Sequence, residues 1–172
     1  MKYLVLIFCF LIVSSFCKGQ EHPSLPFRSY PRNSIFIELG GNSVFYGSLN
    51  YDRVLLQRNF FYLSGRIGIG YGNFMSNSIL SVPMLVNGIF QVYHALAFEV
   101  GLGVSFMKIT KKEEYGEGLS SYEYDPVPTG AAGLRVQARN GFLFRAVFTP
   151  FITLDHIYSS GGVSFGYSFG KK

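Results

Sequence analysis

The amino-acid sequence predicts an all-β protein, a closed, antiparallel, up-and-down transmembrane β-barrel of about eight strands. The first observation behind this prediction is composition. Of the 172 residues, 48% are hydrophobic and only 15% are charged, whereas about a quarter is usual in soluble domains. The second is a period-two alternation of large apolar residues with small or polar ones, which continues with little interruption after Pro31. A chain whose outer face contacts lipid can carry so few charges.

The clearest alternation runs from His94 to Met107. Large apolar residues from Leu96 to Phe106 occupy one face, and small or polar residues such as Ala97 and Glu99 occupy the other. Most such segments approach the roughly 9–11 residues that a tilted strand needs to cross a bilayer. The expected strands are, approximately, residues 34–42, 44–54, 60–71, 79–90, 94–107, 127–138, 142–151 and 161–170.

The N-terminus has the parts of a secretory signal peptide. Lys2 supplies a positive charge, an apolar run covers Tyr3–Val13, and Gly19 provides a small residue at the cleavage point. The apolar run is too short to span a bilayer as a membrane anchor. We expect a signal peptide at 1–19, a periplasmic segment at 20–33 and the outer-membrane barrel at 34–170.

Both cysteines, Cys9 and Cys17, lie in the expected signal peptide, so the mature chain offers no disulfide and no cysteine metal site. An alternative is lipoprotein acylation at Cys17, which Phe16 disfavours because such motifs want a small residue there. Removing Lys2 and Lys18 lowers the formal net charge from +5 to +3, which is too weak to indicate nucleic-acid binding.

The main structural alternative is a soluble eight-stranded barrel of the lipocalin kind, which places large apolar side chains inside and charges outside. Here the expected apolar face carries almost no charge. Arg53 and His94 are the exceptions, and both fall at expected strand ends. A Lys or Arg on the lipid face at mid-bilayer costs about 2–4 kcal/mol. The scarcity of such residues favours the membrane.

The expected connections alternate between short turns and longer loops, as is typical of the periplasmic and outer ends of these barrels. Short turns are expected at 57–59, 91–93 and 139–141, longer outer loops at 72–78, 108–126 and 153–160, and a short first outer connection at 40–43. Four prolines are expected near the outer ends of their strands, where water can replace the ladder hydrogen bond that proline lacks. They are Pro83, Pro126, Pro128 and Pro150.

The alternation places five charged residues on the inward face, at similar heights above the periplasmic end. They are Glu38, Arg66, Glu99, Arg135 and Arg145. Because an eight-stranded barrel is just wide enough to be filled by side chains, we expect the five to meet and pair, since a buried unpaired ion is costly. Two acids against three bases leave one positive charge, for which Asp52 is the expected partner. We interpret this layer as a structural plug; a gated or ion-conducting lumen is the alternative.

These features resemble the small eight-stranded outer-membrane barrels of the OmpA/OmpX type, over nearly all of the mature chain. The resemblance is carried by ELGGNSVFYGSLNYDR (Glu38–Arg53), the inward charges and the aromatic ending GVSFGYSF (Gly162–Phe169). The ending is similar to the C-terminal strand signal that barrel-assembly machinery reads, although Gly170, Lys171 and Lys172 follow Phe169. The resemblance implies fold and location, while activity differs among such proteins.

Two loop segments are candidate sites. Asp155 and His156, with Ser159 and Ser160, suggest an outer-membrane lipid hydrolase, but spacing alone does not establish an activated serine, and we expect an ordinary loop. The loop Lys108–Pro126 holds half of the acids of the chain and lacks the spacing of a calcium site. Its tyrosines are the expected surface-contact residues, since recognition residues sit on exposed loops. They are Tyr115, Tyr122 and Tyr124.

The function expected from these observations is a non-enzymatic outer-membrane protein that contributes to envelope integrity or surface interaction through its outer loops. A narrow transport pore and the lipid hydrolase are the alternatives. We expect no catalytic residue, cofactor or metal; His22 and His94 have no companions at metal-ligand spacing. The expected partners are outer-membrane lipid or lipopolysaccharide, the barrel-assembly machinery and an unidentified surface partner, and we expect a monomer that binds no nucleic acid.

Overall fold

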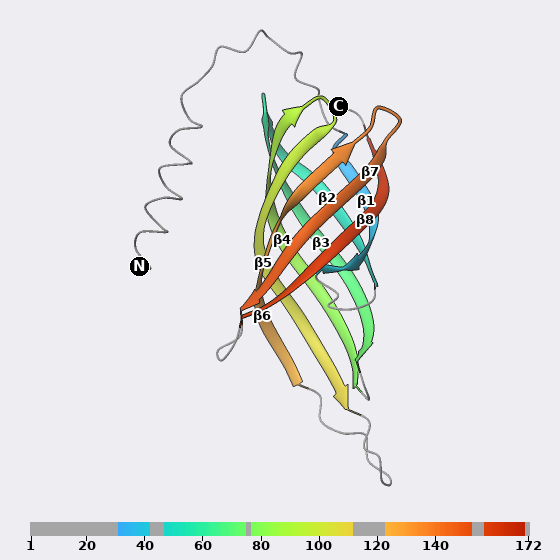
Figure 1. The fold of residues 1–172 in the computed structure, drawn as a ribbon, viewed down its shortest axis with the longest axis vertical. Helices are drawn as coiled ribbons and strands as arrows, with labels where there is room; N and C mark the ends of the chain where they lie inside the picture. The colour runs from blue at the N-terminus through green and yellow to red at the C-terminus, as the bar shows by residue number, and fades with distance from the viewer. Residues whose placement is uncertain (1–30, 42–46, 75–76, 112–122, 153–156, 171–172) are drawn as a thin grey trace, which may run out of the picture.

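The computed structural model describes residues 31–41, 47–74, 77–111, 123–152 and 157–170. These residues form one closed antiparallel barrel, in which each strand pairs with its neighbours in sequence and the last strand pairs with the first (Figure 1). The strands are β1 (Asn33–Gly40), β2 (Gly47–Arg58), β3 (Phe61–Phe74), β4 (Asn77–Tyr93), β5 (Leu96–Lys111), β6 (Glu123–Gln137), β7 (Phe142–Ile152) and β8 (Ile157–Phe169). The predicted fold class, a closed antiparallel barrel of eight strands, is confirmed. Among the described residues, no helix is long and apolar enough to cross a membrane.

The two faces of the barrel wall have opposite polarity. In β5, Phe98, Leu102 and Phe106 point outward and are exposed, with Leu102 reaching 74% exposure, while Glu99 and Ser105 point inward and are buried. The same alternation recurs in the other strands because a strand directs successive side chains to opposite faces. The outside of the barrel is therefore apolar, and the inside is lined by charged, polar and small residues with a few buried apolar ones.

The turn between β4 and β5 lies later than the sequence predicted. β4 continues to Tyr93, so the expected turn at 91–93 is wrong and the chain reverses at His94 instead. His94 adopts a positive φ of 38° and stacks on Tyr93, with ring centroids 4.3 Å apart. The Gln91 side chain also donates a hydrogen bond to the His94 carbonyl at 2.7 Å. These local contacts fix a tight reversal that alternation alone could not locate.

The strands are also longer than expected at the end opposite the β2–β3 and β4–β5 turns. The β4–β5 ladder extends to the pair Asn77↔Lys111, so parts of the expected loops at 72–78 and 108–126 are strand. Figure 1 shows β5 and β6 projecting beyond β7 and β8. The first two strands differ in the opposite sense: β1 ends at Gly40 and β2 begins at Gly47, rather than at 42 and 44. Polar residues in the extended ladders resemble loop residues, which explains the error.

Pro83 interrupts a ladder well inside β4, so its expected place near the outer end of a strand is wrong. The β3–β4 pairing passes from Ile67↔Met84 to Gly70↔Ser81 and omits the pairs between them. The β6–β7 pairing likewise omits Pro150. Proline has no N–H to donate to a ladder, and both gaps follow from this property.

Candidate functional site: the charged lumen

The six charged residues expected in the lumen come from six different strands, and none is more than 3% exposed. The residues are Glu38 of β1, Asp52 of β2, Arg66 of β3, Glu99 of β5, Arg135 of β6 and Arg145 of β7. Strand alternation places each of them inward. In β1, for example, Ile35 and Ile37 are exposed while Phe36 and Glu38 are buried. The structure brings all six together across the barrel.

Arg135 pairs with two carboxylates. Its Nη1 lies 2.5 Å from Asp52 Oδ2 and 3.5 Å from Glu99 Oε2. Its Nη2 donates a hydrogen bond to Ser34 Oγ at 3.1 Å, and its Nε donates one to Gln137 Oε1 at 3.4 Å. The guanidinium therefore has partners on four other positions of the wall, as a planar five-donor group can accommodate.

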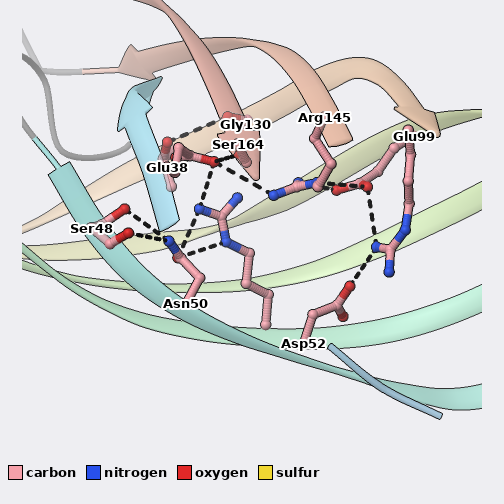
Figure 2. Close-up of polar contacts among 11 residues, drawn as sticks. Glu38, Ser48, Asn50, Asp52, Glu99, Gly130, Arg145 and Ser164 are labelled. Carbon is pink, nitrogen blue, oxygen red and sulfur yellow. Dashed lines mark hydrogen bonds and ion pairs between the residues drawn. The ribbon is translucent and has the colours of Figure 1, made fainter. Parts of the chain in front are cut away.

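Arg145 occupies the centre of the network between two glutamates, and Figure 2 shows the three side chains pointing toward one another. Its Nη2 forms an ion pair with Glu99 Oε1, and its Nε donates to Glu99 Oε2 at 3.2 Å. This contact is two-pronged, the arrangement in which arginine and carboxylate interact most strongly. Nη1 of Arg145 lies 3.5 Å from Glu38 Oε2.

Arg66 completes the network on the other side of Glu38. Its Nη2 lies 2.9 Å from Glu38 Oε2, and its Nε and Nη2 both donate to Asn50 Oδ1, at 2.9 and 2.8 Å. The Asn50 amide in turn donates to Ser48 Oγ at 2.8 Å (Figure 2). Ser164 donates to Glu38 Oε2 at 3.2 Å. Glu38 thus joins Arg66 and Arg145.

Phe36 lies beneath two of the guanidinium groups, in a position that the sequence analysis missed. The Cζ atoms of Arg145 and Arg66 lie 4.5 and 5.1 Å from its ring centroid, within the range of a cation–π contact. Gly166 on β8 makes room for Phe36, because a Cβ there would lie only 2.3 Å from Phe36 Cβ. The sequence could have predicted this position, because Phe36 is two residues before Glu38 and strand alternation directs both side chains inward.

Three carboxylates and three guanidinium groups balance the formal charge of the network. The β6–β7 register places Arg135 directly opposite Arg145, and the carboxylates of other strands separate these like charges. A balanced network with this many contacts can fill and stiffen the barrel. The Ser164 hydroxyl donates to the Glu38 carboxylate, but Arg66 and Arg145 also bind that carboxylate, so it is held as an ion-pair partner rather than as a free general base.

The remaining candidate residues are mostly outside the described part of the chain. This holds for Tyr115, Tyr122, His22, Asp155 and His156. Tyr124 belongs to β6 and pairs with Lys108 in the β5–β6 ladder, but its side chain is not among those described. Ser159 and Ser160 lie in β8. Within the described residues, no group of His, Cys, Asp and Glu could hold a metal ion.

The fold is shared with solved outer-membrane proteins. The nanodisc structure of Ail from Yersinia pestis matches with 15% identity and a TM-score of 0.54, over 81% of this chain and 99% of that one. The N-terminal barrel of Pseudomonas aeruginosa OprF matches with 16% identity and a TM-score of 0.57, over 81% and 99% of the two chains. No protein-family model and no curated protein matches this chain.

The architecture defined by these observations is that of the small eight-stranded outer-membrane barrels. The resemblance stated from the sequence is confirmed at the level of fold, by the closed barrel and by the similarity to Ail and OprF.

Proposed function

We propose that this chain is an exported outer-membrane barrel without enzymatic activity, which supports the envelope and presents its outer loops for surface interaction. The observation that carries this proposal is the inverted polarity of the wall. Arg135 and Arg145 are buried inside the barrel, while Ile37, Leu102 and Phe148 are more than half exposed outside. A soluble barrel would leave this apolar surface in water, where exposed apolar patches of such extent are rare.

The role in surface interaction has two supports. The charged network occupies the lumen, and recognition residues are disproportionately carried by the loops that a rigid scaffold positions. One protein of the same fold, Ail, is named for attachment and invasion. By analogy of fold, we propose that the segment 112–122 and its neighbours contact a surface partner, and that the barrel is a monomeric scaffold embedded in outer-membrane lipid.

The first test is heat modifiability of the protein in the isolated outer-membrane fraction. We expect a compact, fast-migrating form on a denaturing gel without boiling, which shifts to the unfolded position after boiling. A protein found in the soluble fraction with no such shift would contradict the proposal and favour a ligand-binding periplasmic barrel.

A loop deletion separates scaffold from recognition. Removal of residues 112–122 leaves every described strand intact, so we expect the heat shift to persist while binding of cells to a host or matrix surface is lost. A matched internal control is replacement of residues 75 and 76 by two glycines in the shorter β3–β4 connection, which keeps the two residues that join the paired Phe74 and Asn77. Equal loss of binding in both variants would argue against the longer loop as the contact surface.

A further inference from the structure

The apolar outer surface of the barrel has a basic interruption on β1, β2 and β3, near the end that carries the short turns. Arg53 points outward and is exposed. It is paired in register with Asn33 of β1 and with Gly65 of β3. Gly65 contributes no side chain of its own beside Arg53, and the Leu55 side chain lies over it, with Cδ1 3.4 Å from where a Cβ would stand.

Two further groups give this interruption the character of a site. Tyr51 donates its hydroxyl hydrogen to Asn33 Oδ1 at 2.7 Å, which orients the Asn33 amide. The Arg32 carbonyl accepts a hydrogen bond from the Val54 N–H at 2.8 Å, so the backbone of Arg32 lies next to β2. Arg53 and an oriented amide therefore lie side by side where β1 begins, with the backbone of Arg32 next to them.

No described carboxylate balances Arg32 and Arg53. The acids whose side chains are described, Glu38, Asp52 and Glu99, are all buried in the lumen. Arg58, at the end of β2, and Arg139, in the turn before β7, add exposed positive charge to the same rim. This end of the barrel is suited to an anion.

An apolar groove lies directly above Arg53 on the same three strands. It has a volume of about 320 Å³ and is lined on its apolar side by Ile35, Leu49, Tyr51, Ile67 and Ile69. The register places Ile35, Tyr51 and Ile67 in the row next to Asn33, Arg53 and Gly65. The groove and the basic group thus form one continuous surface, with its charged part toward the rim.

We propose that this surface binds an anionic glycerophospholipid of the inner leaflet, with its phosphate at Arg53 and the Asn33 amide and an acyl chain in the groove. The inference rests on the proposed membrane location. An arginine on the lipid face is costly unless its head reaches the polar interface, and guanidinium is well matched to phosphate oxygens. The apolar groove then accommodates the part of the same molecule that avoids water.

A second groove on the barrel exterior shows the contrast. It is larger, about 540 Å³, and lies over β6, β7 and β8 near Ala132, Ala146 and Val163. In the next row toward the rim it meets Phe144 and Phe165, whose ring centroids lie 5.2 Å apart, rather than an arginine. Apolar shape is present at both places, but a basic group adjoins only the first of these two grooves.

The test is native mass spectrometry of the full mature protein in a zwitterionic detergent, titrated with dioleoyl phosphatidylglycerol or dioleoyl phosphatidylcholine. We expect one phosphatidylglycerol to bind in preference to phosphatidylcholine. Arg53→Gln should weaken it about tenfold, the factor that corresponds to one charge-assisted hydrogen bond. Arg58→Gln is the matched control, because Arg58 is exposed on the same strand but lies beyond the groove, and it should have little effect.

Ile67→Phe tests the groove separately. It should weaken binding of the dioleoyl lipid and leave binding of dihexanoyl phosphatidylglycerol unchanged. Equal weakening by Arg53→Gln and Arg58→Gln, or equal affinity for the two headgroups, would overturn the proposal in favour of diffuse charge attraction. If Arg53→Gln lacks the heat shift of a folded barrel, Asn33→Ala, which removes the oriented amide beside Arg53, tests the same site. A folded barrel without lipid preference defeats this inference alone, whereas a chain that never enters the membrane defeats the proposed function.

Discussion

Arg135 Nη1 and Asp52 Oδ2 lie 2.5 Å apart across the lumen, although the two residues are separated by 83 positions in the sequence. Asp52 lies closer to the β2–β3 turn than Glu38 does, because Glu38 pairs with Ser48, four residues before Asp52. The Asp52 carboxylate supplies the third negative charge of the network. This pair therefore determines whether the three buried guanidinium groups are fully balanced. Its removal is the most direct test of the plug.

Asp52→Asn should destabilise the barrel by about 3 kcal/mol, the lower end of the cost of breaking a buried ion pair. The lower end applies because Arg135 keeps Glu99 at 3.5 Å and Ser34 at 3.1 Å. The measurement is the urea dependence of unfolding in lipid vesicles. The double variant Asp52→Asn/Arg135→Gln should lose less unfolding free energy than the two single variants lose together. A loss equal to the sum of the two single losses would show that the pair is not coupled.

Leu102→Arg tests which solvent surrounds the barrel. Leu102 is 74% exposed near the middle of β5, so in a bilayer the arginine should cost about 2–4 kcal/mol. Val92, 64% exposed beside the β4–β5 turn, is the matched site, where Val92→Arg should cost about 0–1 kcal/mol. Comparable, near-zero costs at both positions would indicate that water, not lipid, contacts β5.

Gly166→Ala should destabilise the barrel by about 1–3 kcal/mol, as overpacking does. The added methyl would lie 2.2 Å from the Ile35 carbonyl oxygen and 2.3 Å from Phe36 Cβ. Phe36, whose ring contacts the Arg145 guanidinium, would therefore have to move. Gly161→Ala on the same strand is the control, because nothing lies within 4 Å of a Cβ there. Equilibrium unfolding of both variants should separate them, and identical midpoints would rule out this packing argument.

Planar-bilayer recordings should show no conductance for the wild-type protein. The ion pairs of Glu38, Glu99 and Arg145 cross the lumen, and their side chains are fully packed. Insertion is verified independently by the heat shift of protein recovered from the same vesicles. Discrete ion-selective channels from the wild-type chain would replace the plug with the narrow-pore alternative.

Much of this architecture could be predicted because strand alternation has a strict period. Once Glu99 is assigned inward, the faces of every residue in β5 follow, and the same holds for Glu38 in β1. The inward positions of the six charges were therefore accessible from sequence. Asn50, which accepts two hydrogen bonds from Arg66, could have been included by the same parity argument, since Asp52 is two residues away.

Strand ends were less accessible, because they depend on pairing with a distant segment. Asn77 and Lys111 are polar residues that are typical of loops, yet they pair with each other and extend the β4–β5 ladder. The same cause explains the error at Pro83. β4 begins at Asn77 rather than at residue 79, so Pro83 lies farther inside the strand than expected. The partners within the network were likewise fixed by barrel closure, which no local pattern encodes.

The opposition of Arg135 and Arg145 in the β6–β7 hairpin also constrains how the chain can fold. Like charges placed directly across a strand pair repel, so this hairpin is electrostatically frustrated by itself. Relief comes from Glu99 on β5, from Asp52 on β2 and from Glu38 on β1, which reaches β7 only when β1 joins β8. An open sheet lacking its first strands would offer Glu99 as the one carboxylate of the network for both arginines, and barrel closure supplies the other two carboxylates, Asp52 and Glu38.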